Sequence, residues 1–137
     1  DHVAGFTCFN DGSMRDWQKH STVAGKNFTA SSSVGPWMVT PDEIENVDAF
    51  RVISRLNGNE MQNDTVDMMF FSITEQIEYL SKIMELHPGD IIATGSPEGS
   101  GGQREPQVFM NPGDVIEIEV PGVGLLSNPI VGDGLEA

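Results

Sequence analysis

The sequence predicts a β-rich α+β fold with one main helix, and three observations favour this class. Short apolar segments rich in aromatic and β-branched residues recur along the chain. Turn dipeptides such as Asn-Gly and Pro-Gly separate these segments. One segment repeats apolar residues at helical spacing over several turns. Because the chain enters an apolar run almost at once, we expect residues 1–137 to be part of a single domain whose upstream portion is missing.

The first elements are expected to be a buried strand, a short helix, a loop and a second strand. Residues 3–9 are short, apolar and rich in β-formers, which is typical of a buried strand. Ser13 and Asp16 have the spacing of a capping box, so we expect a short helix to begin there. Residues 21–35 are rich in Ser, Thr, Gly and Asn and predict a loop, and residues 36–39 predict a strand.

The middle of the chain predicts a hairpin followed by the main helix. Residues 50–56 and 60–65 are the two predicted strands, and Asn57-Gly58 between them suits a type I′ turn with positive φ at both positions. Ser72 and Glu75 form a second capping-box pattern. The helix behind it would present one apolar stripe, made of Ile73, Ile77, Leu80, Ile83 and Met84.

The last third predicts further short strands. Two Pro-Gly-Asp units, at residues 88–90 and 112–114, suit type II turns. Each is expected to lead into a strand, over residues 91–94 and 115–120, and short edge segments should follow over 122–126 and 129–131. The apolar residues 68–71, before the main helix, are expected in the core.

Charge and cysteine content exclude several functions. The chain has 7 Lys+Arg against 21 Asp+Glu and a net charge of −14. A chain this acidic is repelled by phosphate backbones and by anionic lipid surfaces, so we expect neither a nucleic-acid partner nor a membrane partner. Cys8 is the single cysteine and is expected in the core. This cysteine content fits a reducing compartment, and we expect a cytoplasmic protein.

Asp11, Arg15 and Gln18 form the first candidate site. If one helix carries all three, they lie at positions i, i+4 and i+7 on one face. A carboxylate can hold a hard divalent cation, a guanidinium can bind a substrate carboxylate, and an amide can orient either. The alternative is a helix cap with a salt-linked surface. Because these residues directly follow a buried strand, both interpretations stay open.

Two further segments are candidates for binding an anion. Lys26 stands among small and apolar residues, where a lysine can be desolvated and contact a substrate, although a solvated loop lysine is the simpler interpretation. Residues 94–97 read Thr-Gly-Ser-Pro and open a glycine-rich turn. Backbone N–H groups and hydroxyls in such a turn can bind an oxyanion, but the pattern matches neither a P-loop nor a dinucleotide fingerprint.

Taken in order, these motifs resemble the C-terminal half of the fumarylacetoacetate hydrolase family. The resemblance runs through almost the whole chain, and the ordered set is far more specific than any one motif. The matching stretches are 5–11, 15–18, 25–28, 35–42, 56–58, 88–97, 112–115 and 122–128.

The resemblance implies a partly open mixed β-barrel, a homodimer, and a divalent cation, Mg²⁺ (or Mn²⁺ or Ca²⁺). It implies Asp11 as a metal ligand, Arg15 and Gln18 as substrate-binding residues, Lys26 as a catalytic residue that contacts the oxo acid, and Ser96 as a substrate contact. Family members usually have Thr at the position of Ser96, so this chain keeps the hydroxyl and lacks a methyl group.

The implied activity is metal-dependent hydrolysis of a C–C bond in a 2-oxo acid or acylpyruvate-type dicarbonyl compound, as in aromatic catabolism. The alternatives are an isomerase, decarboxylase or hydratase acting on 2-oxo-dienoic acids, or a non-catalytic binding module with the same fold. Family members also carry a Glu-x-Glu metal element and a His-Glu pair upstream of the Asn-Asp element. Glu117-Ile118-Glu119 has this Glu-x-Glu spacing, but it lies near the C-terminus, and we expect its carboxylates on the outward face of a strand.

Overall fold

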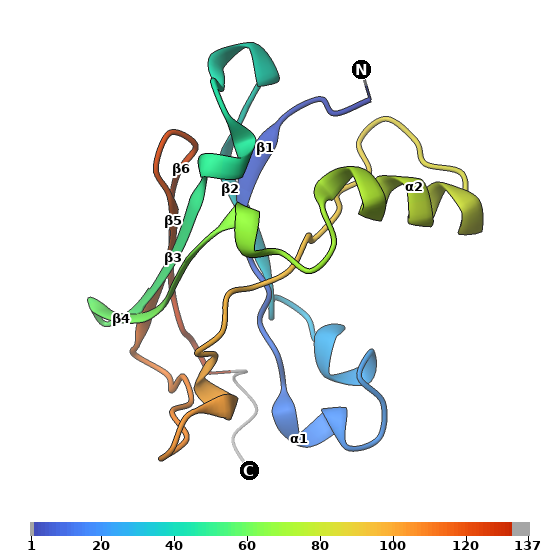
Figure 1. Cartoon of the computed structure of the whole chain (residues 1–137). Helices are drawn as coiled ribbons and strands as arrows, with labels where there is room; N and C mark the ends of the chain where they lie inside the picture. Colours follow the sequence, from blue (N-terminus) through green and yellow to red (C-terminus); the bar gives the residue numbers. More distant parts are fainter. Residues whose placement is uncertain (1, 133–137) are drawn as a thin grey trace.

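The computed structural model describes residues 2–132 and contains two antiparallel sheets and one main helix (Figure 1). This arrangement confirms the predicted α+β class with its single main helix. The strands are β1 (Phe6–Asn10), β2 (Ser33–Val39), β3 (Arg51–Leu56), β4 (Asn59–Thr65), β5 (Val115–Val120) and β6 (Gly124–Pro129). The helices are α1 (Arg15–Gln18) and α2 (Ile73–Ile83). The described residues also contain 3₁₀ turns at Ala24–Lys26, Pro41–Glu43, Val47–Ala49, Val66–Met68 and Gly101–Gln103.

Each strand pairing in the described part of the chain is antiparallel. One sheet pairs β1 with β2, and the other has the order β4-β3-β5-β6. The family resemblance implies a partly open mixed barrel, whereas the described residues form two antiparallel sheets in contact through β2 and β6. β3 and β4 form the predicted hairpin, in which Asn57 and Gly58 both have positive φ, of 51° and 78°. This is the backbone geometry that a type I′ turn requires.

The core lies where β1 packs against β5 and β6. Its buried side chains are Cys8, Ile116, Ile118, Val120, Val123 and Leu126. Every second residue of β5 is buried, so Glu117 and Glu119 lie on the outward face, as predicted. Glu119 Oε2 forms an ion pair of 2.6 Å with Arg55 Nη1 on the neighbouring strand. Trp37 joins the two sheets, because its Nε1 donates to the Val123 carbonyl at 2.6 Å.

Helix α2 begins as the sequence predicts and stands apart from the strands (Figure 1). Ser72 and Glu75 form both hydrogen bonds of the capping box. No side chain of α2 is buried, and Ile83 is largely exposed. Of the preceding apolar residues, Met68, Phe70 and Phe71 are exposed and Met69 is half-buried, so the prediction that residues 68–71 lie in the core is wrong. They occupy a 3₁₀ turn and the link to α2.

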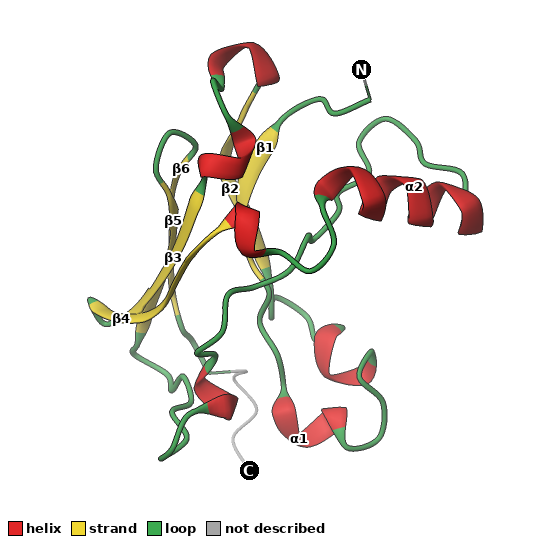
Figure 2. Ribbon diagram, viewed as in Figure 1, coloured by secondary structure: helices red, strands yellow, loops and turns green. Residues whose placement is uncertain are grey.

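Three local predictions are also wrong. Ser13 does not cap α1, since its hydroxyl donates to the Asp11 carbonyl at 3.4 Å and Met14 occupies the N-cap position. Residues 91–94 are not a strand, and Figure 2 shows the chain after α2 without regular structure there. The loop predicted over residues 21–35 contains a 3₁₀ turn and ends at Ser33, where β2 begins.

No helix in residues 2–132 has the length and apolar character needed to cross a membrane.

Candidate functional site

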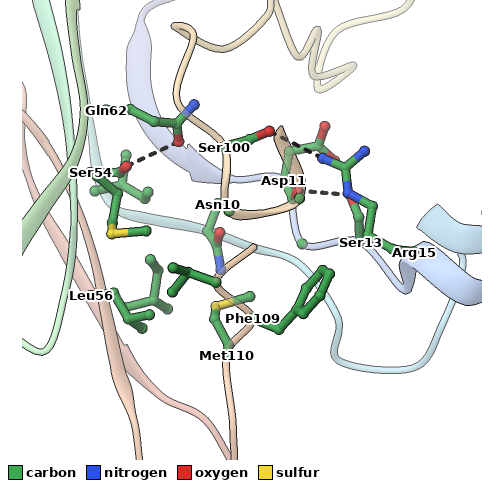
Figure 3. Close-up of a pocket in the computed structure, with 17 residues that line it drawn as sticks. Asn10, Asp11, Ser13, Arg15, Ser54, Leu56, Gln62, Ser100, Phe109 and Met110 are labelled. Atoms are coloured by element: carbon green, nitrogen blue, oxygen red, sulfur yellow. Dashed lines mark hydrogen bonds between the residues drawn. The ribbon is translucent and has the colours of Figure 1, made fainter. Parts of the chain in front are cut away.

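The end of β1 opens into two adjoining cavities, of about 280 and 130 Å³. The larger cavity is lined by Asp11, Lys26, Arg15 and Ser96, which come from three separate segments of the chain. The smaller cavity shares Asp11 and Arg15 and continues over apolar side chains that include Leu56, Phe109 and Met110 (Figure 3). The structure therefore brings four of the five predicted site residues to one cavity.

Lys26 and Asp11 lie side by side in the lining of the larger cavity. The Lys26 ammonium is ion-paired with the Asp11 carboxylate, and it also donates to the Asp11 backbone carbonyl at 3.4 Å. Their side chains keep 32% and 37% of their surface exposed, so both remain accessible to a ligand. Lys26 is thus neither a freely solvated loop lysine nor a buried one.

Gly25 explains how Lys26 reaches this position. The 3₁₀ turn Ala24–Lys26 packs closely against α1, and the Met14 N–H donates to the Gly25 carbonyl at 2.9 Å. A Cβ atom on Gly25 would lie 2.7 Å from the Met14 carbonyl oxygen and 2.3 Å from Gln18 Cγ. Because only glycine permits this approach, the sequence Gly25-Lys26 sets the lysine beside Asp11.

Arg15 is held by two side chains on either side of its guanidinium group. Nη1 donates to Gln18 Oε1 at 3.1 Å. Nη2 donates to the Ser100 hydroxyl at 3.3 Å, and Figure 3 shows this second bond. The Ser100 hydroxyl in turn donates to Gln103 Oε1 at 3.0 Å. Gln18 lines neither of the two cavities and contacts them through its hydrogen bond to Arg15, and its predicted role in substrate binding stays a prediction. Asp11 precedes α1 and does not share a helical face with Arg15.

Ser96 lies at the rim of the larger cavity, in a segment without regular structure. Gly95, directly before it, has a φ of 129°, a conformation that residues with a side chain rarely adopt. Among the hydrogen bonds of the described residues, none involves the Ser96 hydroxyl. The hydroxyl is therefore available to a ligand in the cavity.

Sequence reasoning missed Ser54, Gln62 and Ser100, which also line both cavities. Ser54 is 3% exposed, and its hydroxyl donates to Gln62 Oε1 at 3.0 Å across the β3–β4 hairpin (Figure 3). The available signal was that Ser54 shares one face of a predicted strand with the apolar residues Val52 and Leu56, because a buried hydroxyl requires a partner. The pairing with Gln62 depends on the hairpin register, which residue types alone do not reveal.

The residues present fit a metal only in part. The Asp11 carboxylate faces the cavity and suits a hard divalent cation, which takes six or more oxygen ligands. Within residues 2–132, no group of three or more His, Cys, Asp or Glu side chains is arranged to hold a metal ion. Glu117 and Glu119 lie in neither cavity lining. The described residues therefore offer one carboxylate ligand and no complete site.

Fold and site together define a class: an α+β domain with a carboxylate, a lysine, an arginine and a hydroxyl around one cavity. The sequence profile described as fumarylacetoacetate (FAA) hydrolase C-terminal matches residues 1–131. The chain belongs to the fumarylacetoacetate hydrolase family. This confirms the resemblance seen in the sequence.

Three relatives illustrate the range of the family. A mitochondrial oxaloacetate tautomerase of Xenopus laevis is 38% identical over 135 residues, which are 96% of this chain and 42% of that protein. The fumarylacetoacetate hydrolase of Exiguobacterium antarcticum has a TM-score of 0.89 and 34% identity over 95% of this chain and 47% of its own. The maleylpyruvate hydrolase of Sphingobium sp. SYK-6, solved with manganese(II) and pyruvate, has a TM-score of 0.81 and 29% identity over 94% of this chain and 44% of its own.

This chain thus spans less than half the length of each of these relatives. They include hydrolases and a tautomerase on one fold, so the match to the family leaves the reaction of this protein open between those classes.

Proposed function

We propose that this protein acts as a divalent-metal-dependent enzyme on 2-oxo acids, cleaving a C–C bond in an acylpyruvate-type dicarbonyl substrate. The observation that carries the proposal is the grouping of Lys26, Arg15 and Ser96 around the Asp11 carboxylate in one cavity. In a chain with a net charge of −14, two cations on one cavity wall mark a place where an anion is accepted.

Each side chain has a defined part in this proposal. Asp11 provides one oxygen ligand to the cation. A bound divalent cation supplies positive charge that stabilises the enolate of a 2-oxo acid. Lys26 and Arg15 bind the substrate carboxylate, since a guanidinium can hold it with two parallel hydrogen bonds. Gln18 orients Arg15 by accepting a hydrogen bond from Nη1. The Ser96 hydroxyl donates a hydrogen bond to a substrate oxygen.

Tautomerisation is the second candidate reaction, and the 38% identity to an oxaloacetate tautomerase favours it. Hydrolysis and tautomerisation share the enolate that the same residues would stabilise. They differ in whether this enolate is released by C–C cleavage or is reprotonated. The cavity residues of this chain would bind and orient the substrate in both reactions. They do not distinguish hydrolysis from tautomerisation, so a reaction assay is needed.

The metal and the oligomeric state belong to the same proposal. The manganese(II) and pyruvate in the Sphingobium relative support a divalent cation beside a 2-oxo acid. We propose Mg²⁺ or Mn²⁺ as the ion and a homodimer as the assembly. Metal analysis of the purified protein and light scattering test these two points separately from the reaction.

The reaction is tested with protein from the complete coding sequence, stripped of metal and then reloaded with Mg²⁺ or Mn²⁺. An acylpyruvate and oxaloacetate are offered in parallel, and pyruvate release and loss of the enol absorbance are followed. Pyruvate release from the acylpyruvate that depends on the metal supports hydrolysis. Enol–keto conversion without cleavage supports the tautomerase instead. Binding of oxalate with neither reaction would leave a binding module and overturn the proposed catalysis.

A further inference from the structure

The segment that carries Ser96 is held by side chains instead of by a sheet. Residues 91–97 have no regular secondary structure. Gln76 Nε2 on α2 donates to the Thr94 carbonyl at 3.0 Å. Gln62 Nε2 on β4 donates to the Pro97 carbonyl. Two amide groups from different elements therefore fix the backbone on both sides of Ser96.

The Gln62 amide has its own fixed orientation. Its Oε1 accepts a hydrogen bond of 3.0 Å from the Ser54 hydroxyl, which lies on β3 and is buried. Since the amide oxygen faces Ser54, the amide nitrogen on the other side of the group faces Pro97. The hairpin register that pairs Ser54 with Gln62 thus aims this donor at the segment.

Gln76 holds the other end of the segment. Its Nε2 also donates to the Phe71 carbonyl at 3.0 Å, so one amide group bridges the residues before α2 and the segment after it. The capping box of Ser72 and Glu75 fixes the first turn of α2, from which Gln76 projects. This gives the exposed helix a link to the cavity, although none of its side chains is buried.

Between these two anchors the backbone turns through Gly95, with its φ of 129°, and presents Ser96 at the cavity. We propose that Gln62 and Gln76 are positioning residues, which hold the Thr94 and Pro97 carbonyls so that the Ser96 hydroxyl points to a substrate oxygen. This inference rests on the proposed function, because it assigns Ser96 to a 2-oxo acid. Fixing the segment before the ligand arrives reduces the ordering cost of binding.

The test compares four variants of the full-length protein. Gln76→Leu removes the donor to Thr94, and Gln62→Leu removes both the donor to Pro97 and the acceptor of the Ser54 hydroxyl. Gln62→Glu keeps the shape of the side chain and the acceptor for Ser54, but it has no N–H for Pro97. Asn63→Leu is the matched control, because Asn63 is the next residue on β4, points to the other face, and bonds only Arg51 and Glu60.

Backbone ¹⁵N relaxation measured by NMR reports on the segment directly, through the N–H groups of Thr94, Gly95 and Ser96. We expect greater mobility at these residues in the three glutamine variants and wild-type values in Asn63→Leu. Gln62→Leu should also lower the Tm, because it leaves the buried Ser54 hydroxyl without its partner. Wild-type relaxation in both Gln62→Glu and Gln76→Leu would overturn the proposal. This readout requires no ligand, so it remains decisive even if the proposed function fails.

Oxalate titration of the Mn²⁺-loaded protein reports on Ser96. We expect Gln62→Leu and Gln76→Leu each to bind oxalate roughly three- to tenfold more weakly, and Ser96→Ala to bind with a similar loss. In the Ser96→Ala background, Gln62→Leu should have no further effect, because its role is carried by Ser96. If Gln62→Leu weakened oxalate binding as much in the Ser96→Ala protein as in wild type, Gln62 would act independently of Ser96. That result would overturn the positioning role. If wild type itself fails to bind oxalate, the proposed function fails and the role of Ser96 with it.

Discussion

The Lys26 ammonium is ion-paired with the Asp11 carboxylate, although 15 positions separate the two residues in the chain. Both side chains line the larger cavity and remain about one-third exposed, at 32% and 37%. In the proposed enzyme, Asp11 binds a cation and Lys26 binds the substrate carboxylate. Before the substrate binds, the positive charge of Lys26 and the negative charge of Asp11 neutralise each other.

Replacement of Lys26 by Met should lower kcat/KM and the affinity for oxalate. A hydrogen bond to a charged group is worth about 1.5–3 kcal/mol, so we expect a loss of at least about tenfold in each. Titration of Mg²⁺-loaded full-length protein with oxalate measures the affinity. The matched control is Lys82→Met, because Lys82 forms a 2.7 Å ion pair with Glu78 on the exposed face of α2. Equal oxalate affinities for Lys26→Met and wild type would remove Lys26 from the site.

Replacement of Asp11 by Asn should weaken the binding of a divalent cation. The amide keeps the shape of the side chain but loses the negative charge of the ligand, and we expect at least about a tenfold loss in Mn²⁺ affinity. Titration followed by electron paramagnetic resonance measures free Mn²⁺ directly. Asp16→Asn is the control, since Asp16 is 95% exposed and contacts only Lys19. Wild-type Mn²⁺ affinity in Asp11→Asn would show that the cation is held elsewhere.

The parts of the fold that the sequence predicts best depend on contacts between near neighbours. The capping box joins Ser72 to Glu75, and the hairpin turn needs only Asn57 and Gly58. The alternation in β5 is also visible in six consecutive residues, Val115–Val120. Each of these signals is complete within a few positions, so no knowledge of the rest of the chain is required.

The failures have the opposite cause. Residues 91–94 have the composition of a strand, but a strand needs a partner, and here the carbonyl of Thr94 accepts from the side chain of Gln76 instead. Ser13 has the spacing of a helix cap, but the backbone of Met14 is bound to Gly25 and α1 is four residues long. The grouping of Asp11 with Lys26 is equally non-local, and the family resemblance, not residue spacing, brought these two residues together.

Cys8 should be unreactive in the folded protein. Its side chain is 1% exposed, and its thiol donates to the Gly124 carbonyl at 3.3 Å. Burial raises the pKa of the Cys8 thiol, so the reactive thiolate is scarce at neutral pH. Labelling with iodoacetamide should be slow in buffer and rapid in denaturant. Fast labelling of the folded protein would mean that β1 and β6 separate readily.

Replacement of Gly58 by Val should destabilise the protein and leave the site intact. Gly58 has a φ of 78°, and a β-branched residue in this region costs about 1–2 kcal/mol. There is open space around the missing Cβ, so the cost comes from the backbone and not from a clash. Thermal unfolding should show a lower Tm, while the KM of the folded enzyme stays unchanged. A change in KM without a loss of stability would place this turn near the substrate.

The last prediction concerns Asp114, which joins the Asn57-Gly58 turn to the turn before β5. Asn57 Nδ2 donates to Asp114 Oδ1 at 2.8 Å, and the Asn111 N–H donates to Asp114 Oδ2 at 2.7 Å. These hydrogen bonds, that from the Asn57 side chain first, lower the pKa of the Asp114 carboxyl below its ordinary value.

A carboxyl whose pKa is lower in the folded state stabilises the fold fully above its unfolded pKa of about 3.9. This contribution is lost as the pH falls through the lower, folded pKa. Asp114→Asn keeps the shape of the side chain but removes the charge, so it should destabilise the protein at neutral pH and have less effect at about pH 3. Urea unfolding of both proteins at the two pH values measures the difference.

Asp67→Asn is the control, because Asp67 takes part in none of the side-chain hydrogen bonds or ion pairs within residues 2–132. A difference between wild type and Asp114→Asn that does not shrink at the lower pH would mean that the charge of Asp114 does not stabilise the junction of the two turns.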